Sequence, residues 1–118
     1  MILMKGDVEI ALLKEIESLD LLESLIQQIV KDADLAGAVF NCPKDISAKQ
    51  FILKIYDFIL ELMTSDFGTY LNFLYRVDLS EKTLLSVTDT EPKRIAEQVT
   101  LMVLKREWQK VWFRSKSQ

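Results

Sequence analysis

The sequence contains no histidine, one cysteine (Cys42), three glycines and two prolines among its 118 residues. Without histidine it lacks the side chain that most often serves as general base and metal ligand. A single cysteine excludes an internal disulfide and the zinc sites built from four cysteines or from two cysteines and two histidines. Three scattered glycines do not form a glycine-rich phosphate-binding loop. We therefore expect a protein that is not an enzyme and has no cofactor or metal.

Long apolar runs are also missing. No stretch reaches 18 consecutive apolar residues, so we expect no membrane-spanning helix. The first seven residues, MILMKGD, are apolar over only four positions and have no basic region before them, which is unlike a secretory signal. With one unpaired cysteine and no export signal, the expected location is the cytoplasm.

Hydrophobic residues make up 49% of the chain, and they recur at steps of three and four nearly throughout. This spacing indicates amphipathic helices, whereas strand-like alternation is hard to find. A chain of this length can bury a core without disulfides. The sequence therefore predicts an all-α protein, a compact bundle of four to six helices that forms a single domain over residues 1–118. We expect a short flexible N-terminus at 1–6 and a C-terminal tail at 115–118.

The first apolar stripe runs from residue 7 to about 32, with Asp7 as a reasonable N-cap. We expect one long helix there; the alternative is a break near Ser18, which would cap a second helix. Gly37 is suited to ending a helix. Ser47 is expected to cap a helix over 48–63, which is apolar around most of its circumference and is therefore placed at the centre of the core.

Three further helices are expected in the second half. Asp66 should cap a short one that ends near residue 76, and Asp78 or Ser80 should cap another. The last helix is expected to run from about 91 to 114, with Thr90 as N-cap and Pro92 in its first turn.

The net charge of −3 is the sum of two regions of the chain that have opposite charge. Residues 93–118 hold seven basic and two acidic groups, a net of +5, whereas residues 1–92 hold eight basic and sixteen acidic groups, a net of −8. The basic groups accompany two tryptophans on the last helix. This helix is where we expect contacts with other molecules.

The last helix has two apolar faces separated by polar wedges, one of which contains Thr100 and Glu107. One face should pack on the core, and the other is a candidate interface. Its residues are Leu101, Leu104, Trp108, Val111 and Trp112. Tryptophan is enriched at the centres of interfaces, and twofold dimers are the commonest assemblies. We expect a non-enzymatic interaction or assembly module, a homodimer through this helix or a binder of another protein. The alternative is a helix covered on both sides within its own chain.

Basic side chains interleaved with aromatic ones also raise a nucleic-acid alternative. The candidate basic patch consists of Lys105, Arg106, Lys110 and Arg114. An acidic remainder and a pI of about 5.0 count against binding a polyanion.

Three features of the sequence resemble catalytic or metal-binding motifs, but each has a structural explanation. Asp66-Phe67-Gly68 spells a kinase metal-binding triplet but lacks the other kinase motifs, so Asp66 is interpreted as a helix cap. Asp57 and Glu61 lie one turn apart without a Glu-x-x-His partner, which favours surface carboxylates. Cys42 has no histidine to activate it and is interpreted as a packed thiol.

The run at 70–81, YLNFLYRVDLSE, is followed by Ala96-Glu97 and by KREWQKV at 105–111. Together these resemble the second half of small, uncharacterised bacterial helical proteins with an "LLYRIDVSE" core and an "ERQLQK" terminal helix; Trp108 stands where leucine is usual. The resemblance implies a compact helical domain and transfers no catalytic residue. Within this run, Arg76 is expected to pair with Asp78 or Glu81 and so fix the turn between two helices.

Overall fold

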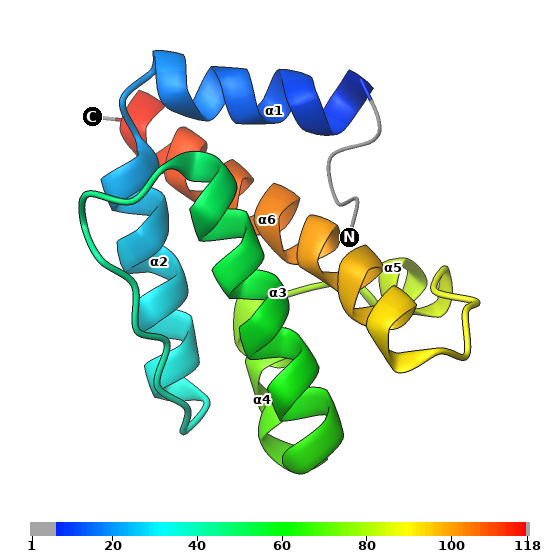
Figure 1. The fold of residues 1–118 in the computed structure, drawn as a ribbon. Coiled ribbons are helices and arrows are strands. Elements are labelled where there is room, and N and C mark those ends of the chain that lie inside the picture. Colours follow the sequence, from blue (N-terminus) through cyan, green and yellow to red (C-terminus); the bar gives the residue numbers. More distant parts are fainter. Residues whose placement is uncertain (1–6, 118) are drawn as a thin grey trace.

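The computed structural model describes residues 7–117, with side chains from Ile10 onward. The expected flexible segment 1–6 lies outside the described residues, as does Gln118. Asp7, the predicted N-cap, is the first residue of the first helix, and its side chain lies outside the described part. Within the described part the chain forms helices and no strand, which confirms the all-α class (Figure 1). The helices are α1 (Asp7–Ser18), α2 (Leu22–Leu35), α3 (Ala48–Ser65), α4 (Phe67–Val77), α5 (Glu81–Leu85) and α6 (Pro92–Lys116).

The expectation of one helix over 7–32 is wrong, and the alternative of a break near Ser18 is confirmed: α1 ends at Ser18, and the chain turns before α2 begins at Leu22. Asp20 has a φ of 54°, in the left-handed region that Asp tolerates better than most residues. Ser18 does not cap α2; its hydroxyl donates back to the Glu15 carbonyl at 3.1 Å. The N-cap of α2 is Leu21, whose side chain makes no capping bond. Apolar spacing continues across this turn, so the sequence pattern does not show it.

The predicted N-caps of α3 and α4 are confirmed. Ser47 accepts from the Gln50 amide, and Gln50 accepts from the Ser47 amide in return, which completes a capping box at α3. Asp66 accepts from the Thr69 amide at α4, as expected of a helix cap.

The structure also shows how α2 and α4 end and how α5 and α6 begin. Gly37, with a φ of 89°, follows the C-cap of α2 as predicted. Ser80 rather than Asp78 caps α5, since Asp78 instead ends α4 with a φ of 71°. Thr90 is not the cap of α6: that position is Glu91, without a side-chain bond, and Pro92 is the first helical residue. The last helix continues to Lys116, into the expected tail.

Helix α6 runs diagonally behind α3, with α1 lying across one end of the bundle and α2 and α4 beside and behind α3 (Figure 1). It contacts α1, α2, α3 and α4, and its most extensive packing is against α3. The predicted central helix, α3, therefore shares the centre of the core with α6. Side chains fully buried there include Phe51, Ile55, Phe73, Val103 and Leu104.

Candidate functional site

The two apolar faces predicted for α6 are parts of one wide buried face. Buried positions follow steps of three and four along the helix: Ala96, Val99, Thr100, Val103, Leu104, Glu107, Trp108 and Val111. Placed at 100° per residue, they span about half of the helix circumference, with Thr100 and Glu107 near the middle. The polar wedge that separated the two faces in the sequence therefore points into the core.

This arrangement places most of the candidate interface inside the chain. Leu104, Trp108 and Val111 are at most 6% exposed, covered by the other helices of the same molecule. Leu101 and Trp112 are half-buried at the edge of the same face. For Leu104, Trp108 and Val111 the alternative expectation is correct, namely a last helix covered on both sides within its own chain. In this fold they are buried and cannot contact a second copy.

A cluster of charged and polar side chains, which we call the charge cluster, lies between α2 and the C-terminal half of α6. Its members are Gln28 and Asp32 of α2 and Glu107, Lys110 and Arg114 of α6. Lys110 lies at its centre. Its Nζ donates to Asp32 Oδ2 of α2 at 2.7 Å and lies beside Glu107 Oε1 of its own helix. The same ammonium reaches the carbonyls of Arg76 and Val77 at the end of α4, at 3.5 and 3.3 Å. One lysine thus joins three helices.

Glu107 is fully buried, and in the described residues neither of its oxygens has a hydrogen-bond partner in good alignment. Burial is the main reason that its pKa rises to about 9, and hydrogen bonding to Asp32 raises it further, against the opposing effect of Lys110. Glu107 is therefore protonated at neutral pH. The proton gives it a donor for the neighbouring Asp32 carboxylate.

Asp32 is the ionised partner in this pair. Burial raises its pKa, but hydrogen bonds from Glu107, Lys110 and Gln28 outweigh burial and hold the pKa below its ordinary value. Gln28 donates to Asp32 Oδ2 at 3.2 Å and accepts from Arg114 at 2.9 Å. The cluster therefore combines one anion, one cation and one neutral acid, with Arg114 at its edge.

A second contact ties α6 to the end of α4. Arg106 donates to the Asp78 carboxylate at 2.9 Å and to the Asp78 carbonyl at 3.3 Å. The predicted pairing of Arg76 with Asp78 or Glu81 is therefore wrong: among these described residues Asp78 pairs with Arg106, and no ion pair joins Arg76 to either carboxylate. Arg76 is exposed and contributes its carbonyl to Lys110.

The candidate basic patch is mostly engaged within the chain. Arg106, Lys110 and Arg114 bond to Asp78, Asp32 and Gln28, as described above. Lys105 is exposed beside a hollow between α6 and the start of α5. Because three of the four cations have internal partners, the geometry disfavours the nucleic-acid alternative.

The two carboxyl groups of the charge cluster are closed to solvent, which limits their chemistry. Asp32 is 4% exposed and Glu107 is 0% exposed, so a substrate cannot reach the carboxyl pair. Through Lys110, the cluster holds α2 and the end of α4 against α6. The sequence analysis missed this cluster because it assigned Glu107 to a polar wedge between two apolar faces; a carboxylate between apolar helix positions was the available signal.

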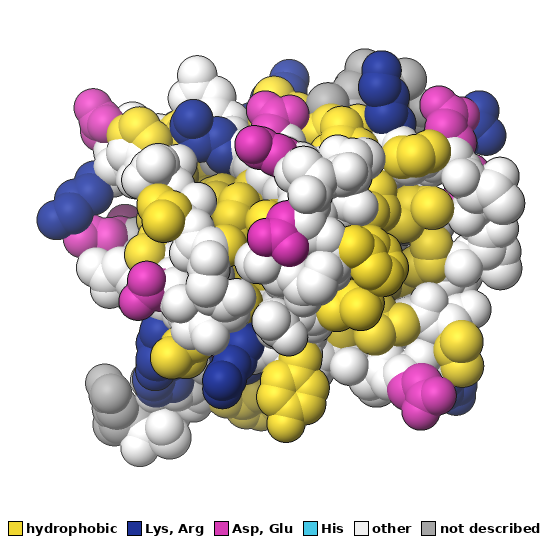
Figure 2. All heavy atoms as spheres, turned by 90° about the horizontal axis from the view of Figure 1, so that it is seen from below, with side chains coloured by type: hydrophobic (Ala, Val, Ile, Leu, Met, Phe, Trp, Pro, Cys, Tyr) yellow, Lys and Arg dark blue, Asp and Glu magenta, His cyan; other side chains and the backbone are white. Residues whose placement is uncertain are grey.

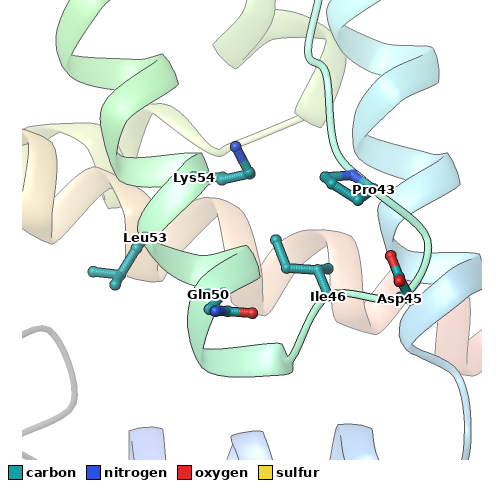
Figure 3. Close-up of a pocket in the computed structure, with 6 residues that line it drawn as sticks. All are labelled: Pro43, Asp45, Ile46, Gln50, Leu53 and Lys54. Atoms are coloured by element: carbon teal, nitrogen blue, oxygen red, sulfur yellow. The ribbon is translucent and has the colours of Figure 1, made fainter.

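Two hollows flank the connection between α2 and α3. Figure 3 shows the first, about 410 Å³, where Ile46 and Lys54 lie between the loop and the first turns of α3. Its residue Gln50 is already used in the capping box. The second lies between α2 and Cys42. Burial raises the pKa of the Cys42 thiol, as expected for a packed rather than an activated cysteine.

The outer side of α4 carries three exposed apolar side chains, which we call the α4 stripe: Phe67, Leu71 and Tyr75. They are 56%, 49% and 80% exposed, and their spacing of four places them on successive turns of one face. Figure 2, a view from the end where α3 leads into α4, shows apolar side chains at the surface over the right half and lower edge, with most charges at the rim and on the left. The sequence pattern alone does not distinguish Phe67 and Leu71 from the apolar residues of this helix that are buried.

Within residues 7–117, none of the helices has the length and apolarity to cross a membrane. The described side chains also include no group of three or more potential ligands placed to hold a metal. Comparison with family models, curated proteins and solved structures found no match to this chain.

Proposed function

We propose that this chain is a non-enzymatic interaction module that forms a homodimer through the α4 stripe. The proposal is carried by the exposure of Phe67, Leu71 and Tyr75 on one face of one helix. Contiguous exposed apolar surface of this kind marks interaction sites, whereas single scattered apolar residues do not. The sequence predicted a dimer interface on α6, whose apolar side chains are largely covered in this fold. We place the interface on α4 instead.

The stripe is self-complementary, which favours a second copy as its partner. Phe67 and Tyr75 lie four residues to either side of Leu71. An antiparallel pair of α4 helices about a twofold axis at Leu71 therefore brings each Phe67 opposite the Tyr75 of the other copy. A twofold dimer uses the same patch on both subunits, and aromatic pairs in offset or edge-to-face contact stabilise such a patch.

Gly68 lies beside the stripe and provides room for an aromatic ring. A Cβ at this position would meet only Asp66 Oδ1, at 3.9 Å. The surface next to Phe67 is therefore flat and open, and the Tyr75 ring of a second copy can cover it.

The size of α4 sets the strength of the dimer. Eleven residues at a rise of 1.5 Å span about 16 Å. An interface built around one such helix lies near or below the roughly 1,200 Å² at the low end for stable complexes. We therefore expect a reversible dimer whose population depends on concentration.

Sedimentation equilibrium over a concentration series tests the proposal. Wild type should shift from monomer to dimer with increasing concentration, and Leu71→Asp should remain monomeric because a carboxylate would be buried at the twofold axis. The matched control is Leu85→Asp, which changes a 72%-exposed leucine on α5 and should dimerise like wild type. A wild-type monomer throughout, or equal effects of the two variants, contradicts the proposal.

A further inference from the structure

A hollow of about 580 Å³ lies between the middle of α6 and the connection from α4 to α5. On one wall, Lys105, Arg106 and Gln109 lie on one face of α6. The opposite wall is formed by residues 78–80 and by Thr83 of α5. Sites for small molecules have volumes of roughly 300–1,000 Å³, so this hollow is large enough for one. None of these residues belongs to the α4 stripe, so the hollow is separate from the proposed dimer interface.

The α6 wall presents two cations to the hollow. Lys105 is exposed, and within residues 7–117 no carboxylate forms an ion pair with it. Arg106 is held in place by Asp78, which accepts from Nη2 at 2.9 Å and from Nε at 3.3 Å. A long contact of 3.5 Å joins Nη1 to Gln109. These bonds use three of the five guanidinium N–H groups, so two are left for a ligand.

The opposite wall adds a hydroxyl donor. Ser80 Oγ accepts from the Thr83 amide at 3.1 Å and lies 2.7 Å from the Thr83 hydroxyl oxygen. The bond between the two hydroxyl groups uses one of their two hydrogens, so one O–H can donate to a ligand. The carboxylate of Asp78 is already paired with Arg106. Among the described lining residues, free donors therefore exceed free acceptors, which favours an anionic ligand.

We propose that this hollow binds a small molecule that carries a phosphate monoester. Such a group has three acceptor oxygens and a charge of about −1.5 to −2 at neutral pH, which matches two cations and a hydroxyl. A carboxylate has fewer acceptor oxygens and a smaller charge, and would leave donors unused. Leu79 and Met102 line the same hollow and provide apolar surface for the body of the ester.

Phenyl phosphate is a suitable probe, because it combines a phosphate monoester with an apolar ring. Its binding to ¹⁵N-labelled wild type is followed at pH 7 by NMR, from the shifts of the backbone amides at 78–83 and 102–109. An open hollow binds so small a ligand weakly, and we expect saturation with a Kd of about 1 mM. Inorganic phosphate should bind more weakly, because it cannot cover Leu79 and Met102. Benzyl alcohol, which has no charge, should not bind.

A pair of lysine variants identifies the site. Lys105→Gln should weaken the binding of phenyl phosphate about tenfold, because it removes a hydrogen bond between two charged groups. The matched control is Lys49→Gln, which changes an exposed lysine of α3 that does not line the hollow and should bind like wild type. Both variants change exposed side chains, and the NMR spectrum itself shows whether each is folded.

Four results would overturn the proposal. The first is the absence of a saturable shift in wild type at about ten times the expected Kd. The second is an equal loss of binding in the two variants, and the third is binding of benzyl alcohol as tight as that of phenyl phosphate. The fourth is binding of inorganic phosphate as tight as that of phenyl phosphate, which would show that the body of the ester makes no contact.

Discussion

Replacing Lys110 with methionine removes the only ammonium from the charge cluster while keeping an unbranched side chain of similar length. Asp32, 4% exposed, would lose its cation, and the carbonyls of Arg76 and Val77 would lose a donor. Removing one partner of a buried ion pair costs about 3–5 kcal/mol. Because the Lys110 side chain is 20% exposed and water can partly replace it, we expect about 3 kcal/mol. This is a large fraction of the roughly 5–15 kcal/mol that stabilises a domain.

Urea denaturation followed by tryptophan fluorescence at pH 7 measures this loss. Lys105→Met is the matched control, because Lys105 is an exposed lysine of the same helix; its effect should stay within about 0.5 kcal/mol. Adding Asp32→Leu to Lys110→Met should recover part of the loss, since a buried pair replaced by apolar groups is often tolerated. A cost below about 1 kcal/mol for Lys110→Met, or one equal to that of Lys105→Met, would refute our account of the cluster.

Three further predictions concern stability. Ser47→Ala removes the N-cap of α3 and should cost about 1 kcal/mol in urea denaturation, whereas Ser47→Asp should cost less. Trp108→Ala should cost about 3–5 kcal/mol, as expected for a core side chain, and a surface-like cost below 1 kcal/mol would contradict its burial. Because the folded-state pKa of Glu107 is raised to about 9 from 4.5, its stabilising proton is fully retained below pH 4.5 and lost as pH rises through 9. Relative to Glu107→Gln, wild type should lose up to about 1.4 kcal/mol of unfolding free energy per pH unit between pH 5 and 8, and parallel pH profiles would contradict this.

The helices and most of their ends could be predicted from local signals. Ser47, Asp66 and Ser80 each precede a helix and bond to its first turn, so the information lies within three residues of the cap. The apolar spacing does not show the turn at Asp20, because it continues from α1 into α2; only Ser18, a residue of the type that caps helices, indicated a break there. Three residues, 19–21, separate the two helices, and Asp20 among them has a left-handed backbone.

The prediction of two separate apolar faces on α6 failed for a different reason. A polar residue in a periodic pattern is normally assigned to solvent, and this rule divided one buried face into two at Thr100 and Glu107. Thr100 is satisfied locally, since its hydroxyl donates to the Ala96 carbonyl at 2.7 Å. Glu107 instead depends on Asp32, which lies on a helix far away in the sequence. The contact between Lys110 and Asp32 spans 78 positions, and local patterning contains no information about it.

Exposed apolar residues are difficult to recognise because an apolar residue in a periodic pattern is normally assigned to the core. Phe67 and Leu71 alternate with the buried Tyr70, Phe73 and Leu74 on a helix of only eleven residues. The apolar side chains therefore cover more than half of the circumference of α4, a wider face than the core buries. Which side is left uncovered depends on where α2, α3 and α6 pack against it.

Disulfide trapping at the centre of the α4 stripe tests the proposed dimer most directly. In a Cys42→Ser background, Leu71→Cys places one thiol on each proposed twofold axis. Helices packed about 8–10 Å apart bring facing Cα atoms to about 3.4–5.4 Å, which overlaps the range of about 4.4–6.8 Å that a disulfide spans. Under mild oxidation we expect Leu71→Cys to form a covalent dimer rapidly and the control Leu85→Cys to form it slowly. Equal rates for the two variants, or no covalent dimer from Leu71→Cys, would contradict a dimer through α4.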